Sequence, residues 1–226
     1  MWTESIDLYC ERVDTSFWAE PINTLTNLAF ILASLYALYI HKKEGLNNKP
    51  YIFLSIMVGF IGVGSFLFHT FANTWSSLAD TIPIWSFVVL YVLFILRIIF
   101  KATWFKTLRI MTIVFVLAYL GFDLANSENS NTKLLNGSLQ YAPALFFMFI
   151  FCISLYVKRR ILFKYSVIAF FVFIISLTFR TFDIYLCNNL NIGTHFMWHI
   201  LNALMLFILL YTLHAAVKEN RLNTKY

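Results

Sequence analysis

Three of the five histidines lie at the ends of long apolar segments, where their side chains could bind a metal ion. His195 and His199, in the stretch HFMWH, have the i, i+4 spacing that places both imidazoles on one face of a helix. His69 ends an earlier apolar segment and could supply a third nitrogen. Three histidine nitrogens with an open fourth position are the arrangement that activates water on zinc. These residues therefore predict a zinc site.

A hydroxyl group and a carboxylate accompany the histidines. Ser65 precedes His69 by four residues, so the two side chains share a helix face. Asp80, in LADTIPIW, begins the next apolar segment at the same level and could orient a ligand histidine or carry protons. Ser65 could be a covalent nucleophile or a donor to a developing oxyanion. The donor role is favoured because the motif is not GxSxG and no dedicated base is evident.

Each of these residues has a simpler interpretation when it is taken alone. A single histidine or aspartate at a helix end is usually an interfacial anchor, and paired histidines also ligate haem. The convergence of five such groups at one depth favours a reaction centre. Haem is disfavoured because bis-histidine ligation usually draws on different helices across the bilayer rather than on three imidazoles at one level.

The elements that must position these residues are long apolar segments. Of the 226 residues, 60% are hydrophobic and 12% are charged, which is not the balance of a soluble protein. Seven segments are near the length that an apolar helix needs to cross a bilayer. They cover residues 22–41, 51–71, 79–99, 106–123, 138–157, 161–184 and 195–216. We therefore predict an all-α, seven-transmembrane helix bundle that forms one domain over residues 1–226, with an acidic outer segment at residues 1–21.

The distribution of positive charge predicts the orientation of this bundle. The net charge is +6, and most of the 17 Lys and Arg residues fall in one alternating set of connecting segments. These are Lys42, Lys43, Lys49, Arg97, Lys101, Lys106, Arg109, Lys158, Arg159, Arg160, Lys164, Lys218, Arg221 and Lys225. Because cytoplasmic segments retain positive charge, the N-terminus is expected outside and the C-terminus in the cytoplasm. Such dispersed charge is a poor match to a nucleic-acid partner.

This orientation places the predicted reaction centre towards the non-cytoplasmic side of the membrane. The membrane would be the plasma membrane in a bacterium, and an endoplasmic reticulum or Golgi membrane in a eukaryote. A polar centre among apolar helices suits a lipid substrate with two chains and an uncharged head that enters sideways. No protein partner is evident from the sequence.

The N-terminal segment is rich in carboxylates and contains one of three cysteines. The acidic residues are Asp7, Glu11, Asp14 and Glu20. Clustered oxygen ligands suit a hard cation such as calcium, although an ordinary acidic loop or a helix cap would account for the same residues. Cys10 and Cys187 both lie in outer segments, where either a disulfide bond or free thiols are compatible with the sequence. Arg180 and Asp183, three residues apart, are expected to form an intramembrane ion pair.

Several stretches together resemble the alkaline ceramidase family, within a seven-helix hydrolase superfamily that also contains the adiponectin-type receptors. The stretches are DLYCERVDTSFWAEPINTLTN, GSFLFH followed by LADTIP, and HFMWH. The resemblance covers nearly the whole chain in order and spacing. It implies an intramembrane zinc amidase that cleaves the N-acyl bond of ceramide. The zinc ligands would fall on His69, His195 and His199, the active-site serine on Ser65 and the aspartate on Asp80.

The resemblance also implies a calcium site and a disulfide bond between Cys10 and Cys187. In the calcium site, a family aspartate is replaced by Leu8 and a family asparagine by Val13. Neighbouring acidic residues could compensate through a shifted loop geometry. The implied ligands are then Asp7, Glu11, Asp14 and Glu20.

Two other functions are compatible with the same sequence. A hydrolase of another lipid amide or ester would use the same reaction centre, because ceramide itself follows only from the resemblance. A membrane receptor or regulator that contains zinc for structural reasons would keep the ligands without turnover. Assays of the purified protein with lipid amides and esters separate these alternatives.

Overall fold

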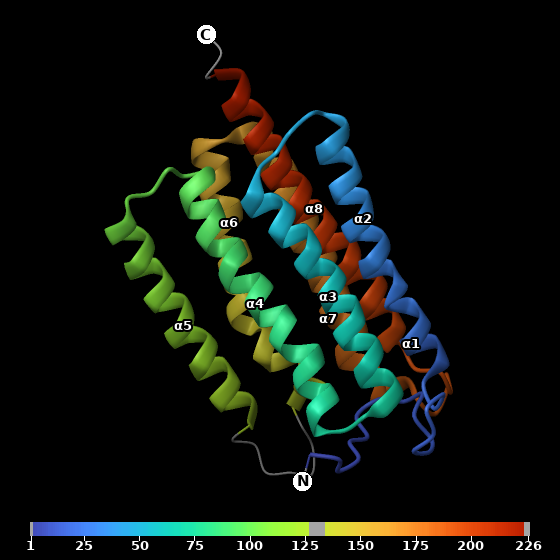
Figure 1. Ribbon diagram of the computed structural model, residues 1–226. Helices are drawn as coiled ribbons and strands as arrows, with labels where there is room; N and C mark the ends of the chain where they lie inside the picture. The colour runs from blue at the N-terminus through green and yellow to red at the C-terminus, as the bar shows by residue number, and fades with distance from the viewer. Residues whose placement is uncertain (1, 127–133, 224–226) are drawn as a thin grey trace.

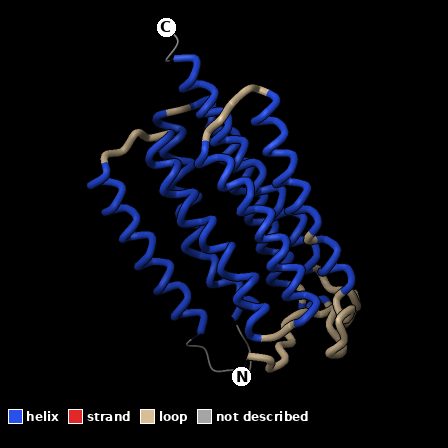
Figure 2. Tube along the Cα trace, viewed as in Figure 1, coloured by secondary structure: helices blue, strands red, loops and turns tan. Residues whose placement is uncertain are grey.

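The computed structural model describes residues 2–126 and 134–223, and throughout these ranges the regular secondary structure is helical (Figure 2). The expected all-α class is therefore confirmed. The helices are α1 (Pro21–Thr26), α2 (Leu28–Lys43), α3 (Lys49–Phe71), α4 (Thr74–Ile98), α5 (Trp104–Asn126), α6 (Ala142–Lys158), α7 (Arg160–Phe182) and α8 (His195–Asn223). Two 3₁₀ segments, η1 (Leu134–Tyr141) and η2 (Ile184–Leu186), precede α6 and follow α7.

Each expected span corresponds to a helix or, for the first span, to the consecutive helices α1 and α2. Among the described residues, six helical segments are long and apolar enough to cross a membrane. They are Pro21–Lys43, Lys49–Phe71, Thr74–Ile98, Leu135–Lys158, Arg160–Phe182 and His195–Leu222. The helix α5 is not one of the six, although it has 23 residues and packs beside α4 at the edge of the bundle (Figure 1). A seventh span thus stays a prediction.

Apolar side chains cover both the inside and the outside of the bundle. The helix α7 packs against α8, and α3 packs against both α2 and α4. Tyr51, Leu54 and Leu210 are fully buried between these helices. On the outer face of α2, by contrast, Leu32 and Tyr36 are more than half exposed. An apolar outer face of this kind is what a lipid environment requires of a membrane helix.

A tight turn brings the end of α3 next to the start of α4. Ala72 adopts a left-handed conformation, and Asn73 then caps α4 by accepting a hydrogen bond from the Ser76 backbone N–H. The Ser76 hydroxyl accepts the Asn73 N–H in return, which completes a capping box. Because the two helices are antiparallel neighbours, His69 near the end of α3 and Asp80 near the start of α4 lie at the same end of the bundle.

The N-terminal segment, residues 2–20, lies across this same end, which we call the N-terminal end of the bundle (Figure 1). The Ile6 N–H donates to the Ala72 carbonyl oxygen at 2.7 Å, which attaches the segment to the turn between α3 and α4. The last turns of α2, α4 and α6 carry Lys42, Arg97 and Lys158 and, like the end of α8, lie at the opposite end (Figure 1). Lys225, which the charge pattern also includes, lies outside the described residues.

Candidate metal centre

Three buried imidazoles meet at the N-terminal end of the bundle. His69 lies in the last turn of α3, and His195 and His199 lie in the first two turns of α8. Each residue is 1% exposed, and one ligand nitrogen from each ring lies within 4.8 Å of the others. Within residues 2–126 and 134–223 this is the one group of three or more such side chains that could hold a metal ion. The structure thus brings together the three histidines that the sequence singles out.

Hydrogen bonding determines which nitrogen His199 presents to a metal. Its Nδ1 lies 2.9 Å from the hydroxyl oxygen of Thr26. The single hydroxyl hydrogen of Thr26 is directed to backbone carbonyl oxygens one turn back, at Ile22 and Asn23, so the Nδ1–H of His199 is the donor. The Nε2 atom then carries a lone pair, and it is buried without a hydrogen-bond partner.

Glu20 determines in the same way which nitrogen of His69 is left for a metal. Its Oε2 atom accepts the Nδ1–H of His69 at 2.6 Å, which leaves Nε2 for a metal. The carboxylate also accepts hydrogen bonds from Asn23 Nδ2 at 3.0 Å and from Arg12 Nε at 2.6 Å. Burial disfavours the charged form of Glu20, but these hydrogen bonds outweigh burial and lower the pKa of its carboxyl group. A carboxylate on the outer nitrogen of a ligand histidine is a recurrent feature of zinc sites.

Stacking and a backbone hydrogen bond hold His195. Its ring stacks on that of Tyr9, with the centroids 3.6 Å apart and the planes 17° from parallel. Its backbone N–H donates to Asp183 Oδ1 at 2.9 Å. Burial raises the pKa of the Tyr9 hydroxyl above its ordinary value of 10, so the stacked ring stays neutral. The Nδ1 atom of His195 is buried without a hydrogen-bond partner.

The donor set fits a zinc ion. Buried polar atoms without a partner are rare in folded proteins, and here two of them, His195 Nδ1 and His199 Nε2, belong to the imidazoles of one cluster. Neutral imidazole nitrogens are preferred ligands of zinc, and three of them leave a fourth position open. The observed hydrogen bonds therefore prepare these rings to accept a metal.

Ser65 and Asp80 line the same cavity as His199. The helices α3 and α4 approach so closely there that a Cβ atom on Gly64 would lie 2.0 Å from the Ala79 carbonyl oxygen. This approach brings the Ser65 hydroxyl within interacting distance of the Asp80 carboxylate. The Oδ1 atom of Asp80 is buried without a hydrogen-bond partner, so it is free to accept a proton.

The four carboxylates expected to bind calcium are not assembled into one group. Asp7 and Asp14 are exposed. Glu11 is buried, and its two oxygens accept the backbone N–H groups at the start of α1, at 2.7 and 2.8 Å. Burial raises the pKa of Glu11 even though these hydrogen bonds oppose the shift. Glu20 is engaged at the metal centre, so the expected set of Asp7, Glu11, Asp14 and Glu20 does not converge.

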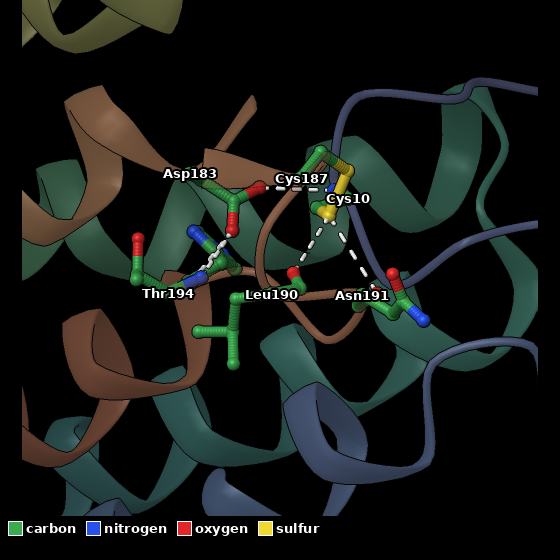
Figure 3. The surroundings of a disulfide bond; sticks show 7 residues. Cys10, Asp183, Cys187, Leu190, Asn191 and Thr194 are labelled. Carbon is green, nitrogen blue, oxygen red and sulfur yellow. Dashed lines mark hydrogen bonds between the residues drawn. A yellow bond between two sulfur atoms is a disulfide. The ribbon is translucent and has the colours of Figure 1, made fainter. Parts of the chain in front are cut away.

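The expected disulfide bond between Cys10 and Cys187 is present, with Cα atoms 5.5 Å apart (Figure 3). Asp183 supports the joined segments, since Oδ2 accepts the Cys10 N–H at 2.9 Å and Oδ1 accepts the Thr194 N–H at 2.7 Å (Figure 3). Gly193 has a positive φ of 61°, and a Cβ atom there would lie 2.2 Å from Asp183 Oδ1. A glycine is therefore required for the carboxylate to reach the start of α8.

The expected ion pair between Arg180 and Asp183 is wrong, because the Asp183 carboxylate is committed to backbone N–H groups. Arg180 instead donates from Nη1 to the Tyr9 hydroxyl at 2.8 Å. Its guanidinium group also lies over the rings of Tyr9, Tyr141 and Trp198, at 5.3–5.5 Å from their centroids. Cation–π contacts thus take the place of the Asp183 carboxylate as the expected partner of Arg180.

Reasoning from the sequence missed three residues that support the imidazoles: Tyr9, Arg12 and Thr26. Thr26 lies inside the first expected span, where a polar side chain is unfavourable unless it has a partner, and this signal could have identified it. Tyr9 and Arg12 lie in a segment without helical periodicity. Their contacts with distant parts of the chain leave no local pattern.

Comparisons with known proteins indicate the family of the chain. A family model described as ceramidase matches residues 3–226 of the chain. Over 83 aligned residues the chain is 39% identical to an alkaline ceramidase of Saccharomyces cerevisiae. That alignment covers 36% of this chain and 26% of the yeast protein, so the chain matches about a quarter of that relative's length. The family match spans nearly all of the chain, whereas the yeast match covers a part of both proteins.

Proposed function

The chain belongs to the ceramidase family, and from this premise we propose that it is an intramembrane, zinc-dependent amidohydrolase. Its substrate would be ceramide, which it would cleave to a sphingoid base and a fatty acid. The observation that carries the proposal is the cluster of three buried imidazoles, whose hydrogen bonds leave ligand nitrogens free beside an apolar cavity. Ser65 and Asp80, the two other reactive side chains, line that same cavity.

His69, His195 and His199 would hold the zinc ion. When bound, zinc supplies a water of lowered pKa and a positive charge for the substrate carbonyl oxygen. Amide hydrolysis also needs a group that takes a proton from the attacking water and returns one to the leaving nitrogen. We assign this role to Asp80, whose Oδ1 atom is buried without a hydrogen-bond partner.

Ser65 would stabilise charge on the substrate carbonyl oxygen as water attacks the carbonyl carbon, before the C–N bond breaks. Its hydroxyl lies one helical turn from His69 on α3, and it lines the cavity with Asp80. A neutral hydroxyl donor placed where negative charge develops lowers the barrier without forming a covalent bond to the substrate. The leaving amine would take its proton from Asp80, so the water oxygen ends in the carboxylic acid and the nitrogen leaves as a neutral amine.

The shape of the cavity suits a long acyl chain. Its lining follows α4 from Asp80 to Ile95, a rise of about 22 Å along the helix. The side chains between these ends are mainly apolar and include Phe87 and Tyr91. An extended chain could therefore lie along α4 with its amide group next to the imidazoles. The apolar walls would exclude water from the rest of the chain.

We also propose that α5 is a seventh membrane span and that the metal centre faces the non-cytoplasmic side. An odd number of spans agrees with the position of residues 2–20 and the end of α8 at opposite ends of the bundle (Figure 1). The basic residues at the end of α8 then lie in the cytoplasm, as their charge favours.

Zinc content and fatty-acid release, measured on the purified protein with ceramide, test this proposal. The His199→Ala variant is expected to lose most of its zinc and to release little fatty acid. His214→Asn is the matched control, because His214 is also buried in α8 but pairs with His41 instead of joining the metal centre. Equal release by wild type and His199→Ala would refute the hydrolase mechanism. Release of fatty acid from lipid esters but not from ceramide would refute ceramide as the substrate.

A further inference from the structure

The Arg12 side chain is buried where the N-terminal segment meets α1 and α3, and it is 3% exposed. Its Nε atom donates to Glu20 Oε1 at 2.6 Å. Its Nη1 and Nη2 atoms donate to the backbone carbonyl oxygens of Asp14, at 3.1 Å, and His69, at 3.0 Å. All three guanidinium nitrogens are therefore engaged, with two acceptors in the N-terminal segment and one at the end of α3.

These hydrogen bonds connect Arg12 to the metal centre by two routes. Glu20 binds Arg12 through Oε1 and the His69 imidazole through Oε2. The His69 backbone carbonyl accepts the third hydrogen bond directly. Arg12 thus holds both the carboxylate that orients this imidazole and the backbone that carries it.

A calcium ion does not fit among these groups. Calcium takes about six to eight oxygen ligands at roughly 2.3–2.6 Å. The Oε1 atom of Glu20 and the carbonyl oxygens of Asp14 and His69 already face a cation, the guanidinium group. The two oxygens of Glu11 accept backbone N–H groups, and the Asp7 carboxylate is exposed. The oxygen atoms of these groups are therefore dispersed or already hydrogen-bonded.

We propose that the Arg12 guanidinium takes the place of a calcium ion in this chain, as a positioning residue that holds Glu20 against the zinc ligand His69. The guanidinium supplies positive charge beside Glu20, as a bound cation would, but it is covalently attached and cannot dissociate. Its planar set of N–H donors matches one carboxylate and two carbonyl oxygens. The stability of the folded chain is therefore independent of calcium. The effect on zinc binding rests on the proposed function, whereas the independence from calcium does not.

Thermal unfolding of the full-length protein tests the independence from calcium. The zinc-loaded protein in detergent is transferred to calcium-free buffer and titrated with calcium chloride, and magnesium chloride serves as the control salt. We expect the same unfolding temperature at every calcium concentration. A saturable rise with calcium that magnesium does not reproduce would overturn the proposal, because a ligand that binds the folded state raises its stability.

Zinc affinity, measured by competition with a chromophoric chelator, tests the positioning role. Arg12→Ala is expected to bind zinc about 10- to 100-fold more weakly, which is the usual effect of removing a group that supports a metal ligand through hydrogen bonds. Arg12→Lys should recover part of this loss, because an ammonium group can pair with Glu20 but lacks the planar fork that also reaches the carbonyl oxygens. Arg160→Ala is the matched control, since Arg160 is the exposed first residue of α7 at the opposite end of the bundle.

Wild-type zinc affinity in Arg12→Ala would overturn the positioning role. If that variant does not fold, Arg12→Lys decides the question, and wild-type affinity in it would count against the role in the same way. Neither measurement uses ceramide. A protein that binds zinc and ignores calcium, but releases no fatty acid, would refute the proposed function while leaving the assignment of Arg12 intact.

Discussion

Each imidazole of the metal centre has its own supporting neighbour. Glu20 accepts from His69, and Thr26 accepts from His199, so both rings carry their hydrogen on Nδ1. His195 is held by an aromatic ring stacked on its face. The three supports come from different parts of residues 9–26. This short region therefore orients the three clustered imidazoles, which belong to α3 and α8.

Replacement of Ser65 tests whether its hydroxyl acts as an oxyanion donor. Ser65→Ala should lower kcat by about 100- to 1,000-fold, the usual effect of losing one such donor, while zinc content stays at the wild-type level. The product should be unchanged, and mass spectrometry should detect no acylated protein during turnover by the wild type. An acyl group trapped on Ser65 would contradict this role and would identify a covalent nucleophile. Ser55→Ala is the matched control, because Ser55 is also buried in α3 but bonds to the backbone one turn back.

The lowered pKa of Glu20 predicts how stability depends on pH. A carboxyl group whose pKa is lower in the folded state stabilises that state above its ordinary pKa of 4.5, and the contribution disappears as pH falls through the folded value. Wild type should therefore be more stable than Glu20→Gln at pH 7, and the difference should shrink below about pH 4.5. Unfolding temperatures measured from pH 7 to pH 3 check this. A difference that grew in acid would contradict the assignment, and Glu219→Gln at the opposite end is the control.

Helix packing determines the distance between Ser65 and Asp80. The helices α3 and α4 touch at Gly64, where a Cβ atom would lie 2.0 Å from the Ala79 carbonyl oxygen. Gly59, on the same helix, lies in a looser contact, since a Cβ atom there would lie 3.3 Å from the Ser34 hydroxyl oxygen. The two positions can therefore be compared directly: a methyl group would fit poorly at Gly64 and more easily at Gly59.

Gly64→Ala is expected to force α3 and α4 apart, because the clash is with backbone rather than with a movable side chain. Overpacking of this kind destabilises a protein by about 1–3 kcal/mol, and the separation should also lower activity by moving Ser65 away from Asp80. Gly59→Ala should have a much smaller effect on stability and on activity. Unfolding temperature and fatty-acid release for the two variants make the comparison. Equal losses would mean that the close contact at Gly64 does not control the site.

The helices, unlike the N-terminal segment, could be predicted from the sequence. Apolar runs of about 20 residues identify membrane helices by length alone, and the position of His69 and His195 at span ends determines their common depth. The path of residues 2–20 has no such signal, because its contacts join residues far apart in the chain. For this reason the sequence suggested a metal ligand at Glu20 but not its pairing with Arg12 or with His69.

On the scale of the whole molecule, the clustered imidazoles and most basic residues lie at opposite ends of the bundle. The imidazoles, the disulfide and residues 2–20 lie at the N-terminal end, whereas basic residues such as Lys42 and Lys158 end helices at the other. A bilayer-spanning chain with this asymmetry should insert in a single orientation.

Reporter fusions at the C-terminus test that orientation in a bacterial host. A fluorescent protein fused there should fold and fluoresce, because it stays in the cytoplasm, and an alkaline phosphatase fusion should be inactive. The physical reason is the retention of basic segments on the cytoplasmic side. Active phosphatase together with a dark fluorescent protein would contradict the predicted cytoplasmic C-terminus.

The disulfide bond can form only late in the biosynthesis of the chain. Cys10 and Cys187 are 177 residues apart, so the bond cannot form until α7 has left the ribosome and entered the membrane. His195 and His199 are synthesised later still. A nascent chain therefore carries only His69 of the three clustered histidines for most of its synthesis, and the cluster is complete only after residue 199 of 226 has been added. Under the proposed zinc-dependent mechanism, a chain that stops before His195 would be inert towards the lipids around it.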